Sequence, residues 1–319
     1  MSGSNDHIGE QARRYGTATI SEAVARLRDG GLVAVPTETV YGLAADSTNA
    51  SAVAEIYRTK GRPDFNPLIV HVPDLDAARK LGKFDDLATK FAGTLWPGPL
   101  TLVVPKSENC PVAAAVTAGL DTIALRCPAH PVMRELLKES GLFLAAPSAN
   151  RSGGISPTTA DHVAHSLGEG APLILDGGPC ERGIESTIIG IDNGNYRILR
   201  PGPVTQAQLE KIAERSPTAA GSGIIEAPGQ LASHYAPSKP LRLNVRISDR
   251  DEYHIGFGQV DGDRNLSPHG DLAEAASLLF AALHDADASG KPRIAVAPIP
   301  ENGIGLALND RLARAASEK

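Results

Sequence analysis

The sequence is poor in aromatic residues and in cysteine, and each shortage argues against a class of protein. Aromatic side chains make up only 4% of the 319 residues, which disfavours a protein that binds single-stranded nucleic acid by stacking bases on aromatic rings. Cys110, Cys127 and Cys180 lie far apart, and none belongs to a Cys-x-x-Cys pair. We therefore expect neither a disulfide framework nor a structural zinc site, and we interpret the three thiols as packing residues.

The chain also lacks a strong excess of charge and a leading apolar run. It carries 37 acidic and 31 basic residues, a formal charge of −6, so bulk charge does not predict non-specific binding to nucleic acid. Residues 1–15 are polar and contain no apolar run of signal-peptide length, and we expect them to be flexible. With 42% hydrophobic residues, the chain is expected to be a cytoplasmic protein large enough for two domains.

Strand-like and helix-like segments alternate along the first part of the chain. The apolar strand-like runs lie at 101–104, 142–146, 172–175 and 186–191, and the helix-like segments at 20–29, 50–59, 130–139 and 205–214. This alternation predicts an α/β or α+β fold with mixed strand directions. Gly30 and Gly31 occupy the place of a left-handed helix cap, so the first helix should end there and a strand should begin at Leu32.

The periodicity fades between about 215 and 240, where Ser, Pro, Gly and Ala dominate as in an interdomain linker. Beyond it follow strand-like runs at 241–247 and 293–298 and helical patterns at 271–285 and 306–317. We therefore divide the chain into a flexible N-terminus (1–15), a first domain (16–205), a linker (206–240) and a smaller second domain (241–319).

Three separated polar blocks indicate one site for anions. In the first block, residues 33–42, an apolar run passes into hydroxyl side chains. This pattern predicts a buried strand that ends by presenting Thr37 and Thr39 at the rim of a sheet. Such rims are where α/β proteins bind ligands.

The second block contains Lys60 and Arg62, followed by Pro63 and Pro67. The prolines favour a non-helical segment, in which a lysine point charge and an arginine fork can converge on one anion. On these residues alone, two solvated basic side chains in a loop remain an alternative.

The third block, Pro-Ser-Ala-Asn at 147–150, places Ser148 and Asn150 two positions apart. On an extended segment both side chains share a face and can hold a phosphate between them. Ser-x-Asn is also a common turn composition, so a structural role stays open.

The usual fingerprints of nucleotide-binding loops are missing. There is no Gly-x-x-x-x-Gly-Lys-Ser/Thr, and the glycines at 256, 258, 303 and 305 do not complete Gly-x-Gly-x-x-Gly. Phosphate binding would instead use Lys60, Arg62, Arg200, hydroxyls and backbone N–H groups.

His162 and His165 are one helical turn apart without a third ligand for a metal ion, so we interpret them as surface residues. We interpret Trp96 as a packing anchor.

The blocks resemble the YrdC/Sua5 family, whose members make threonylcarbamoyl-adenylate, the first intermediate of N6-threonylcarbamoyladenosine in transfer RNA. The resemblance covers residues 36–43, 60–63, 66–71, 96–101, 124–128, 146–153, 156–158, 185–188 and 200–202. It implies a YrdC-like twisted, mixed, open sheet with helices. The linker and the smaller C-terminal domain resemble the long Sua5 type, in which that domain is Rossmann-like.

The resemblance also implies a reaction. Threonine and bicarbonate (or carbon dioxide) give an N-carboxythreonine, whose carboxylate attacks the α-phosphorus of ATP and expels pyrophosphate. Nucleotidyl transfer of this kind depends on charge neutralisation and positioning more than on a protein nucleophile. Mg²⁺ would be held mainly by phosphates and water, with no metal ligands from the protein. The implied partner is a threonylcarbamoyl-transferase complex that modifies transfer RNA.

The family's residue roles carry over to matching positions of this sequence. The four-residue catalytic signature corresponds to Lys60, Arg62, Ser148 and Asn150. The threonine-binding positions correspond to Thr37, His71, Arg126, Ala146 and Ser186, with Arg126 as a fork for the carboxylate. The ATP-binding positions correspond to Arg62, Asn66, Thr122, Ser148, Ser156, Arg200 and Tyr235. Tyr235 would belong to a linker lid that excludes water from the mixed anhydride.

The residues alone leave the roles of some side chains open. Without the family motif, His71 is compatible with an ordinary strand-end histidine and Arg126 with a structural ion-pair partner. Gln230 stands where long-type members often carry methionine, a difference that affects how the lid packs.

The alternative function is an RNA-binding protein of the same fold that acts in RNA or ribosome maturation. It would show salt-sensitive affinity for RNA. A hydrogenase-maturation carbamoyl-transfer protein would need zinc-finger cysteines and an acylphosphatase-like segment, and the sequence has neither.

Overall fold

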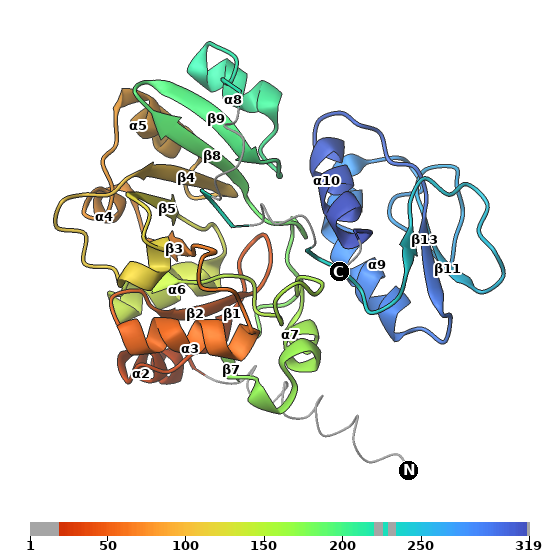
Figure 1. The fold of residues 1–319 in the computed structure, drawn as a ribbon, viewed down its shortest axis with the longest axis horizontal. Helices are drawn as coiled ribbons and strands as arrows, with labels where there is room; N and C mark the ends of the chain where they lie inside the picture. Colours follow the sequence, from red (N-terminus) through yellow and green to blue (C-terminus); the bar gives the residue numbers. More distant parts are fainter. Residues whose placement is uncertain (1–18, 220–225, 229–233, 318–319) are drawn as a thin grey trace.

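The computed structural model describes residues 19–219, 226–228 and 234–317. The predicted flexible segment 1–15 and Gln230 lie outside the described residues. Two units, each with its own sheet, lie side by side (Figure 1). Among the residues described, no helix combines the length and the apolar character needed to span a membrane.

The first unit is built on a nine-stranded mixed sheet with the order β7-β1-β2-β6-β3-β5-β4-β8-β9. Its strands are β1 (Val33–Val35), β2 (Gly42–Asp46), β3 (Ile69–His71), β4 (Leu100–Pro105), β5 (Thr122–Arg126), β6 (Leu144–Ala145), β7 (Leu173–Ile174), β8 (Thr187–Asp192) and β9 (Asn195–Arg200). Strand β3 runs parallel to β5 and antiparallel to β6, and β4 runs antiparallel to β5 and parallel to β8. The predicted mixture of strand directions is confirmed.

Helices cover both faces of this sheet. They are α2 (Ile20–Arg28), α3 (Ala50–Lys60), α4 (Leu75–Arg79), α5 (Asp86–Leu95), α6 (Pro131–Ser140), α7 (Ala160–Leu167) and α8 (Gln206–Ala213), with the short 3₁₀ turns η1 (Ala114–Thr117) and η2 (Gly168–Gly170). The side chains of β1 alternate between two clusters: Val33 and Val35 pack with α2 and α6, whereas Ala34 packs with α3. This alternation follows from the period of two along a strand.

The local signals of the sequence explain the ends of α2. Thr19 caps its N-terminus in a capping box with Glu22, which satisfies otherwise unpaired N–H groups. Its last residue is Arg28, and Gly30 follows with φ +78°, a left-handed conformation that glycine adopts without strain. The predicted end of this helix is confirmed.

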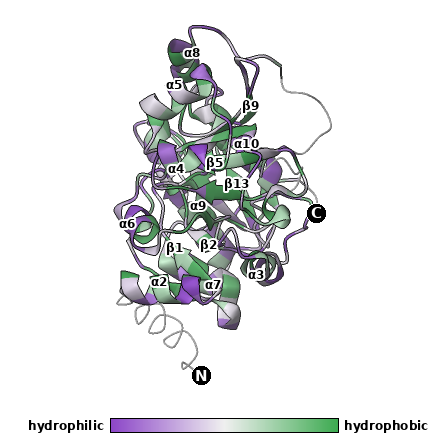
Figure 2. Ribbon diagram, turned by 90° about the vertical axis from the view of Figure 1, so that its left-hand side faces the viewer, coloured by the Kyte–Doolittle hydropathy of each residue, from purple (hydrophilic) through white to green (hydrophobic). Residues whose placement is uncertain are grey.

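The second unit contains a small parallel sheet with the order β10-β13-β11-β12. Its elements are β10 (Leu241–Arg242), β11 (Glu252–Gly256), β12 (Arg264–Asn265), α9 (Leu272–Ala288), β13 (Arg293–Val296) and α10 (Gly305–Ala315). Only the first two residues of the run predicted at 241–247 form a strand. In Figure 2 the strands are largely hydrophobic, and hydrophilic residues gather on the outer helices and loops.

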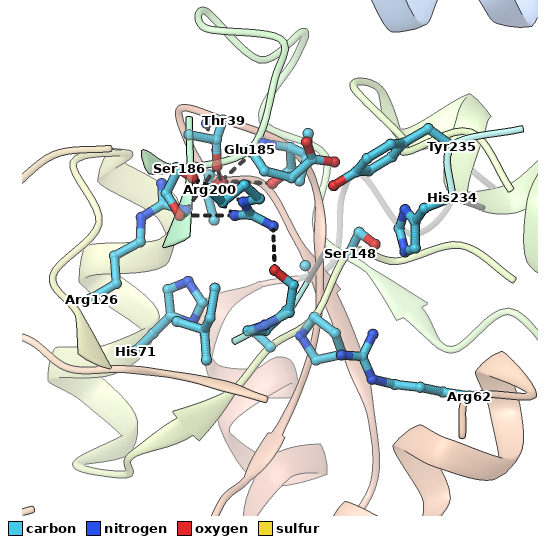
Figure 3. Close-up of a pocket in the computed structure, with 17 residues that line it drawn as sticks. Thr39, Arg62, His71, Arg126, Ser148, Glu185, Ser186, Arg200, His234 and Tyr235 are labelled. Carbon is cyan, nitrogen blue, oxygen red and sulfur yellow. Dashed lines mark hydrogen bonds between the residues drawn. The ribbon is translucent and has the colours of Figure 1, made fainter. Parts of the chain in front are cut away.

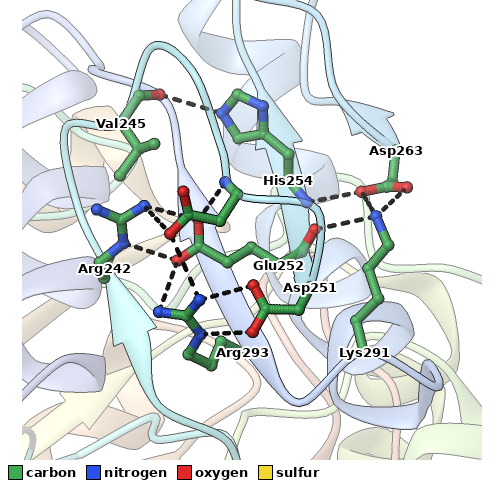
Figure 4. Close-up of polar contacts among 9 residues, drawn as sticks. Arg242, Val245, Asp251, Glu252, His254, Asp263, Lys291 and Arg293 are labelled. Carbon is green, nitrogen blue, oxygen red and sulfur yellow. Dashed lines mark hydrogen bonds and ion pairs between the residues drawn. The ribbon is translucent and has the colours of Figure 1, made fainter.

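Ion pairs link the strands at one edge of the small sheet (Figure 4). Arg242 of β10 forms an ion pair with Glu252 of β11, and Arg293 of β13 with Asp251, both with nitrogen–oxygen distances of 2.6–2.7 Å. Lys291 donates to both carboxylate oxygens of Asp263 at 2.9 Å. These charged groups are therefore already paired with one another within the second unit.

The two units share a hydrophobic cluster. Val40, Ile155 and Ile184 of the first unit pack with Tyr235 and with the core of the second unit. His162 stacks on His284 of α9, with ring centres 3.9 Å apart. His162 is therefore half-buried between the units rather than on the surface as we predicted, because α9 covers that face of α7.

Three further predictions concern packing and boundaries. Cys127 and Cys180 are buried in the first core, and Cys110 and Trp96 pack against it. Their expected packing roles are confirmed.

Helix α8 packs on α5, and its buried face belongs to the same core. The first compact unit thus continues past the predicted boundary at 205 to the end of α8.

Candidate active site

A small chamber lies at one rim of the large sheet, where it meets the linker (Figure 3). Its volume is about 50 Å³. It is lined by Thr37, Thr39, Val40, Gly42, Arg62, Ile69, His71, Arg126, Ala146, Pro147, Ser148, Glu185, Ser186, Arg200, Pro228, His234 and Tyr235. Strand pairing brings these residues together, because β3, β5 and β9 all end at this rim, with His71, Arg126 and Arg200 as their last residues.

Arg126 is anchored by the segment that follows β1. Its Nη1 donates to Thr39 Oγ1 at 2.9 Å, and its Nη2 forms an ion pair with Glu38 Oε1 at 2.7 Å. Thr37 Oγ1 donates to the Val40 carbonyl at 2.6 Å and so closes a tight turn. Burial raises the pKa of Glu38, but Arg126 and backbone N–H groups together lower it by more, so the carboxyl stays ionised. Arg126 therefore both lines the chamber and has a structural ion-pair partner.

His71 is buried beside Arg126, and its Nδ1 has no partner among the described residues. Burial and the charge of Arg126 lower the pKa of its imidazole to about 3. The ring is therefore neutral at physiological pH. A buried polar atom without a partner is rare in proteins, so this nitrogen is available to a ligand or to an ordered water.

Lys60 is the last residue of α3, not part of a loop as we predicted. Pro63 restricts only the residue before it, so the helix continues to Lys60 and ends at Gly61, which has φ +60°. The ammonium of Lys60 donates to the carbonyls of Ser148 and Asn150, both at 2.6 Å. Lys60 does not line the chamber but supports the segment that does.

Ser148 and Asn150 do not share a face as we expected for an extended segment. Ser148 lines the chamber. Asn150 instead directs its amide to the carbonyls of Arg151 and Gly154, both at 2.9 Å. The chain bends at this point, so the alternation of an extended strand does not apply.

Arg62 and Arg200 bring two more buried cations to the chamber. Arg62 donates to the carbonyls of Asn66 and Pro67, and burial lowers its pKa to about 10, which leaves it charged at neutral pH. Arg200 donates through Nε and Nη2 to the Ser186 carbonyl at 3.2 and 3.0 Å. Both amide atoms of Asn66 are buried without a partner among the described residues.

The linker and the residue before Ser186 form the remaining wall. Tyr235 has φ +65°, is 1% exposed, and its hydroxyl has no hydrogen-bond partner among the described residues. The Nδ1 of His234 is likewise unpaired there. Glu185 accepts a hydrogen bond from Ser156 Oγ at 2.5 Å and forms an ion pair with Arg311 of α10.

The structure brings together most, but not all, of the predicted site residues. Those lining the chamber are Thr37, Arg62, His71, Arg126, Ala146, Ser148, Ser186, Arg200 and Tyr235. Those buried behind it are Lys60, Asn66, Asn150 and Ser156. Thr122 starts β5 and is partly exposed, four positions before the chamber residue Arg126. Glu38, Glu185, His234 and Arg311 were not predicted from the sequence; the first three adjoin motif residues, but nothing local marks Arg311.

The electrostatics of the chamber suit an anion. Arg62, Arg126 and Arg200 line it, and Glu185 is the one carboxylate among the described lining residues. Within the described part of the chain, no group of three or more His, Cys, Asp or Glu residues is placed to hold a metal ion. Ligand pockets typically measure roughly 300–1,000 Å³, so this chamber has to widen before a nucleotide can enter. The wall formed by Pro228, His234 and Tyr235 belongs to the linker.

Comparison with known proteins adds independent evidence. Residues 25–202 match the Sua5–YciO–YrdC family, described as telomere recombination, and residues 204–317 match the C-terminal domain of threonylcarbamoyl-AMP synthases. A threonylcarbamoyl-AMP synthase of Bacillus subtilis is 38% identical over 93% of this chain and 92% of its own length. One from Schizosaccharomyces pombe is 34% identical over 89% and 85%.

A solved structure agrees with these relatives. The crystal structure of Pyrococcus abyssi Sua5 complexed with L-threonine superimposes with a TM-score of 0.85 at 37% identity. The match covers 93% of this chain and 94% of that one. It therefore extends over both units.

Proposed function

The chain belongs to the Sua5–YciO–YrdC family in its two-domain form, and from its relatives and its chamber we infer that it is an L-threonylcarbamoyladenylate synthase. This nucleotidyltransferase joins L-threonine, bicarbonate or carbon dioxide, and ATP, and releases pyrophosphate. The product is the first intermediate of N6-threonylcarbamoyladenosine, so the enzyme acts in transfer RNA modification. The observation that carries this conclusion is the convergence of Arg62, Arg126 and Arg200, from distant segments, on one small chamber.

We assign the Arg126 end of the chamber to threonine. The residues in question are Thr37, His71, Arg126, Ala146 and Ser186, all of which line it. An α-carboxylate suits the guanidinium of Arg126, whose orientation is held by Thr39 and Glu38. Because the pKa of His71 is low, its neutral ring offers the unpaired Nδ1 to a polar group of the substrate without adding charge.

We assign the Arg62 and Arg200 side to ATP. Arg62, Ser148, Arg200 and Tyr235 line this part of the chamber. We propose that Asn66, Thr122 and Ser156 complete the set when the chamber opens. The unpaired amide of buried Asn66 supports this assignment for one of them. Lys60 and Asn150 then act by fixing the backbone around Ser148.

The reaction is a displacement at phosphorus. A carboxylate oxygen of N-carboxythreonine forms a bond to the α-phosphorus of ATP, and the bond from that phosphorus to the oxygen bridging the α- and β-phosphates breaks. The electron pair leaves with pyrophosphate. The attacking group is already an anion, so the chain has to supply charge neutralisation and alignment, for which Arg62 and Arg200 are placed.

We propose that Mg²⁺ enters with ATP rather than occupying a site built by the protein. Glu185 is the one carboxylate among the described residues of the chamber wall, and both its oxygens already bind Ser156 and Arg311. When present, the ion would neutralise phosphate charge while phosphate oxygens and water coordinate it. The chain's own residues fit a metal carried by the nucleotide.

We also propose that the linker acts as a lid. Pro228, His234 and Tyr235 of the linker line the chamber. Their closure would protect the mixed anhydride from hydrolysis. We place the reaction in the cytoplasm and expect a threonylcarbamoyl-transferase complex to take up the product. Direct RNA binding remains the alternative function.

The test is pyrophosphate release from ATP and Mg²⁺, with threonine and bicarbonate together, with each omitted in turn, and with serine in place of threonine. Release that requires both substrates is the expected result. A folded chain that binds ATP but shows no threonine-dependent release would contradict the proposed function. Salt-sensitive RNA binding by the same preparation would then favour the RNA-binding alternative.

A further inference from the structure

The second unit contributes a charged residue to the wall of the chamber. Arg311 lies on α10 and is completely buried, and its Nε donates to Glu185 Oε2 at 2.9 Å. Glu185 itself lines the chamber. The two residues are 126 positions apart, so only the packing of the two units brings them together.

Glu185 is an unusual group to find in a site for phosphates. Its side chain is 9% exposed, and its other oxygen accepts the hydroxyl of Ser156 at 2.5 Å. Burial raises the pKa of Glu185, but the charges of Arg311 and Arg200, with the hydrogen bonds from Ser156 and Arg311, together lower it by more, so it is an anion at neutral pH. An uncompensated carboxylate here would repel the triphosphate of ATP.

Arg311 also contacts the linker. Its guanidinium carbon lies 5.4 Å from the ring centre of Tyr235, within the range of a cation–π interaction. Phe280 of α9 packs on the same ring, with centres 5.5 Å apart. In Figure 3 the hydroxyl end of Tyr235 is directed towards Glu185. Arg311 therefore touches both the anionic wall of the chamber and the linker residue that closes it.

We propose that Arg311 is a positioning residue of the nucleotide site: it compensates the charge of Glu185, so that the chamber accepts a triphosphate only while the second unit is docked. This proposal deepens the proposed function and rests on it, since a nucleotide has to occupy the chamber. It assigns the second unit a direct part in substrate binding. Of the remaining guanidinium nitrogens, Nη1 pairs with Asp310, which also pairs with Arg314, and Nη2 has no partner among the described residues.

The competing interpretation is that Arg311 only joins the two units. Both interpretations expect Arg311→Met to be harmful. They differ in what happens when Glu185 is neutralised in the same chain. If Arg311 acts through the charge of Glu185, then Glu185→Gln restores nucleotide binding to the Arg311→Met chain. If Arg311 is only a structural contact, no such rescue occurs.

The experiment measures the affinity of the full chain for a non-hydrolysable ATP analogue with Mg²⁺, by isothermal titration calorimetry. The variants are Arg311→Met, Glu185→Gln, the double variant and the control Arg293→Met. Arg293 is a matched control because it is an ion-paired arginine of the same unit that pairs with Asp251 in the small sheet and does not line the chamber. A thermal unfolding scan confirms that each variant is folded.

We expect Arg311→Met to weaken binding about tenfold or more, and the double variant to return to within about threefold of the unmodified chain. Glu185→Gln alone should bind as tightly as the unmodified chain or more tightly, and Arg293→Met should be unchanged. Binding by Arg311→Met within about threefold of the unmodified chain, or no recovery in the double variant, overturns the proposal.

Two further outcomes keep the test decisive. If Arg311→Met does not fold, the affinity of Glu185→Gln for the analogue decides. Weaker binding by Glu185→Gln than by the unmodified chain means that Glu185 helps to hold the nucleotide, and it overturns the proposal. If the unmodified chain itself does not bind the analogue, the proposed function fails, and the proposal fails with it. Failure of the function is thus distinguished from failure of the charge compensation alone.

Discussion

Arg126 and Glu38 form a buried ion pair at the rim of the large sheet, with Nη2 and Oε1 2.7 Å apart and both side chains at most 5% exposed. The pair joins the end of β5 to the turn that follows β1. Thr39 holds the same guanidinium through Nη1. The orientation of the proposed threonine-binding fork therefore depends on a carboxylate that does not line the chamber.

Replacing Glu38 by glutamine should destabilise the fold and weaken threonine binding. Removal of one partner leaves Arg126 with a buried and unmatched charge, which typically costs about 3–5 kcal/mol. Urea denaturation measures the change in the free energy of unfolding. The control is Glu108→Gln, because Glu108 pairs with Lys83 in solvent with 86% of its side chain exposed, where such pairs contribute about 0–1 kcal/mol. Equal effects in both variants would contradict a structural role for Glu38.

Arg62→Ala should lower the kcat/KM for threonine-dependent pyrophosphate release, and it should also lower stability by about 1–3 kcal/mol because the carbonyls of Asn66 and Pro67 lose their donor. Removing a preorganised donor that faces developing charge typically costs about 3–4 kcal/mol, or roughly two to three orders of magnitude in rate. Arg58→Ala is the matched control, since Arg58 lies near the end of α3 with 77% of its side chain exposed. Near-normal turnover in Arg62→Ala would contradict the assignment of Arg62 to the phosphates.

Tyr235→Phe separates the ligand-binding and packing roles of the linker tyrosine. The ring packs between Phe280 and Arg311, whereas its buried hydroxyl has no partner among the described residues. Removing an unpaired hydroxyl should leave the stability of the free protein unchanged or raise it by up to about 1 kcal/mol. We expect the same change to weaken binding of an ATP analogue, measured by calorimetry. A marked loss of stability would instead mean that the hydroxyl already has a partner in the free protein.

Stability should fall as the pH decreases below about 6.5. Burial lowers the pKa of His71, His162 and His234 to about 3 and that of His284 to about 4. Between these values and the ordinary value of 6.5, the unfolded chain binds protons that the folded chain does not. Each histidine therefore contributes stability that is present near neutral pH and is lost on acidification.

His284→Gln tests this dependence at the contact between the units. The slope of the unfolding free energy between pH 6 and pH 5 should decrease by about 1 kcal/mol per pH unit relative to the unmodified chain. Urea denaturation at several pH values provides the measurement. His269→Gln is the control, because His269 lies on the surface of the same unit. An unchanged slope in His284→Gln would show that this ring does not resist protonation in the fold.

The sequence by itself determined the local elements and the family of this protein. Helix boundaries such as the end of α2 depend on capping residues and glycines within a few positions, and the rim position of Thr37 depends on an apolar run that stops at Pro36. These effects act between near neighbours in the chain, so a linear pattern contains them. The motifs around Lys60, Arg62 and Ser148 likewise identified the candidate site before any contact was known.

Only the tertiary structure decided how the site is assembled. The order of strands places β3 between β6 and β5 and so brings His71 beside Arg126. The contact of Lys60 with the Ser148 carbonyl spans 88 positions, and that of Arg311 with Glu185 spans 126. No local pattern marks such partners, because their pairing depends on burial and charge balance that exist only once the sheet is formed and the two units have packed together.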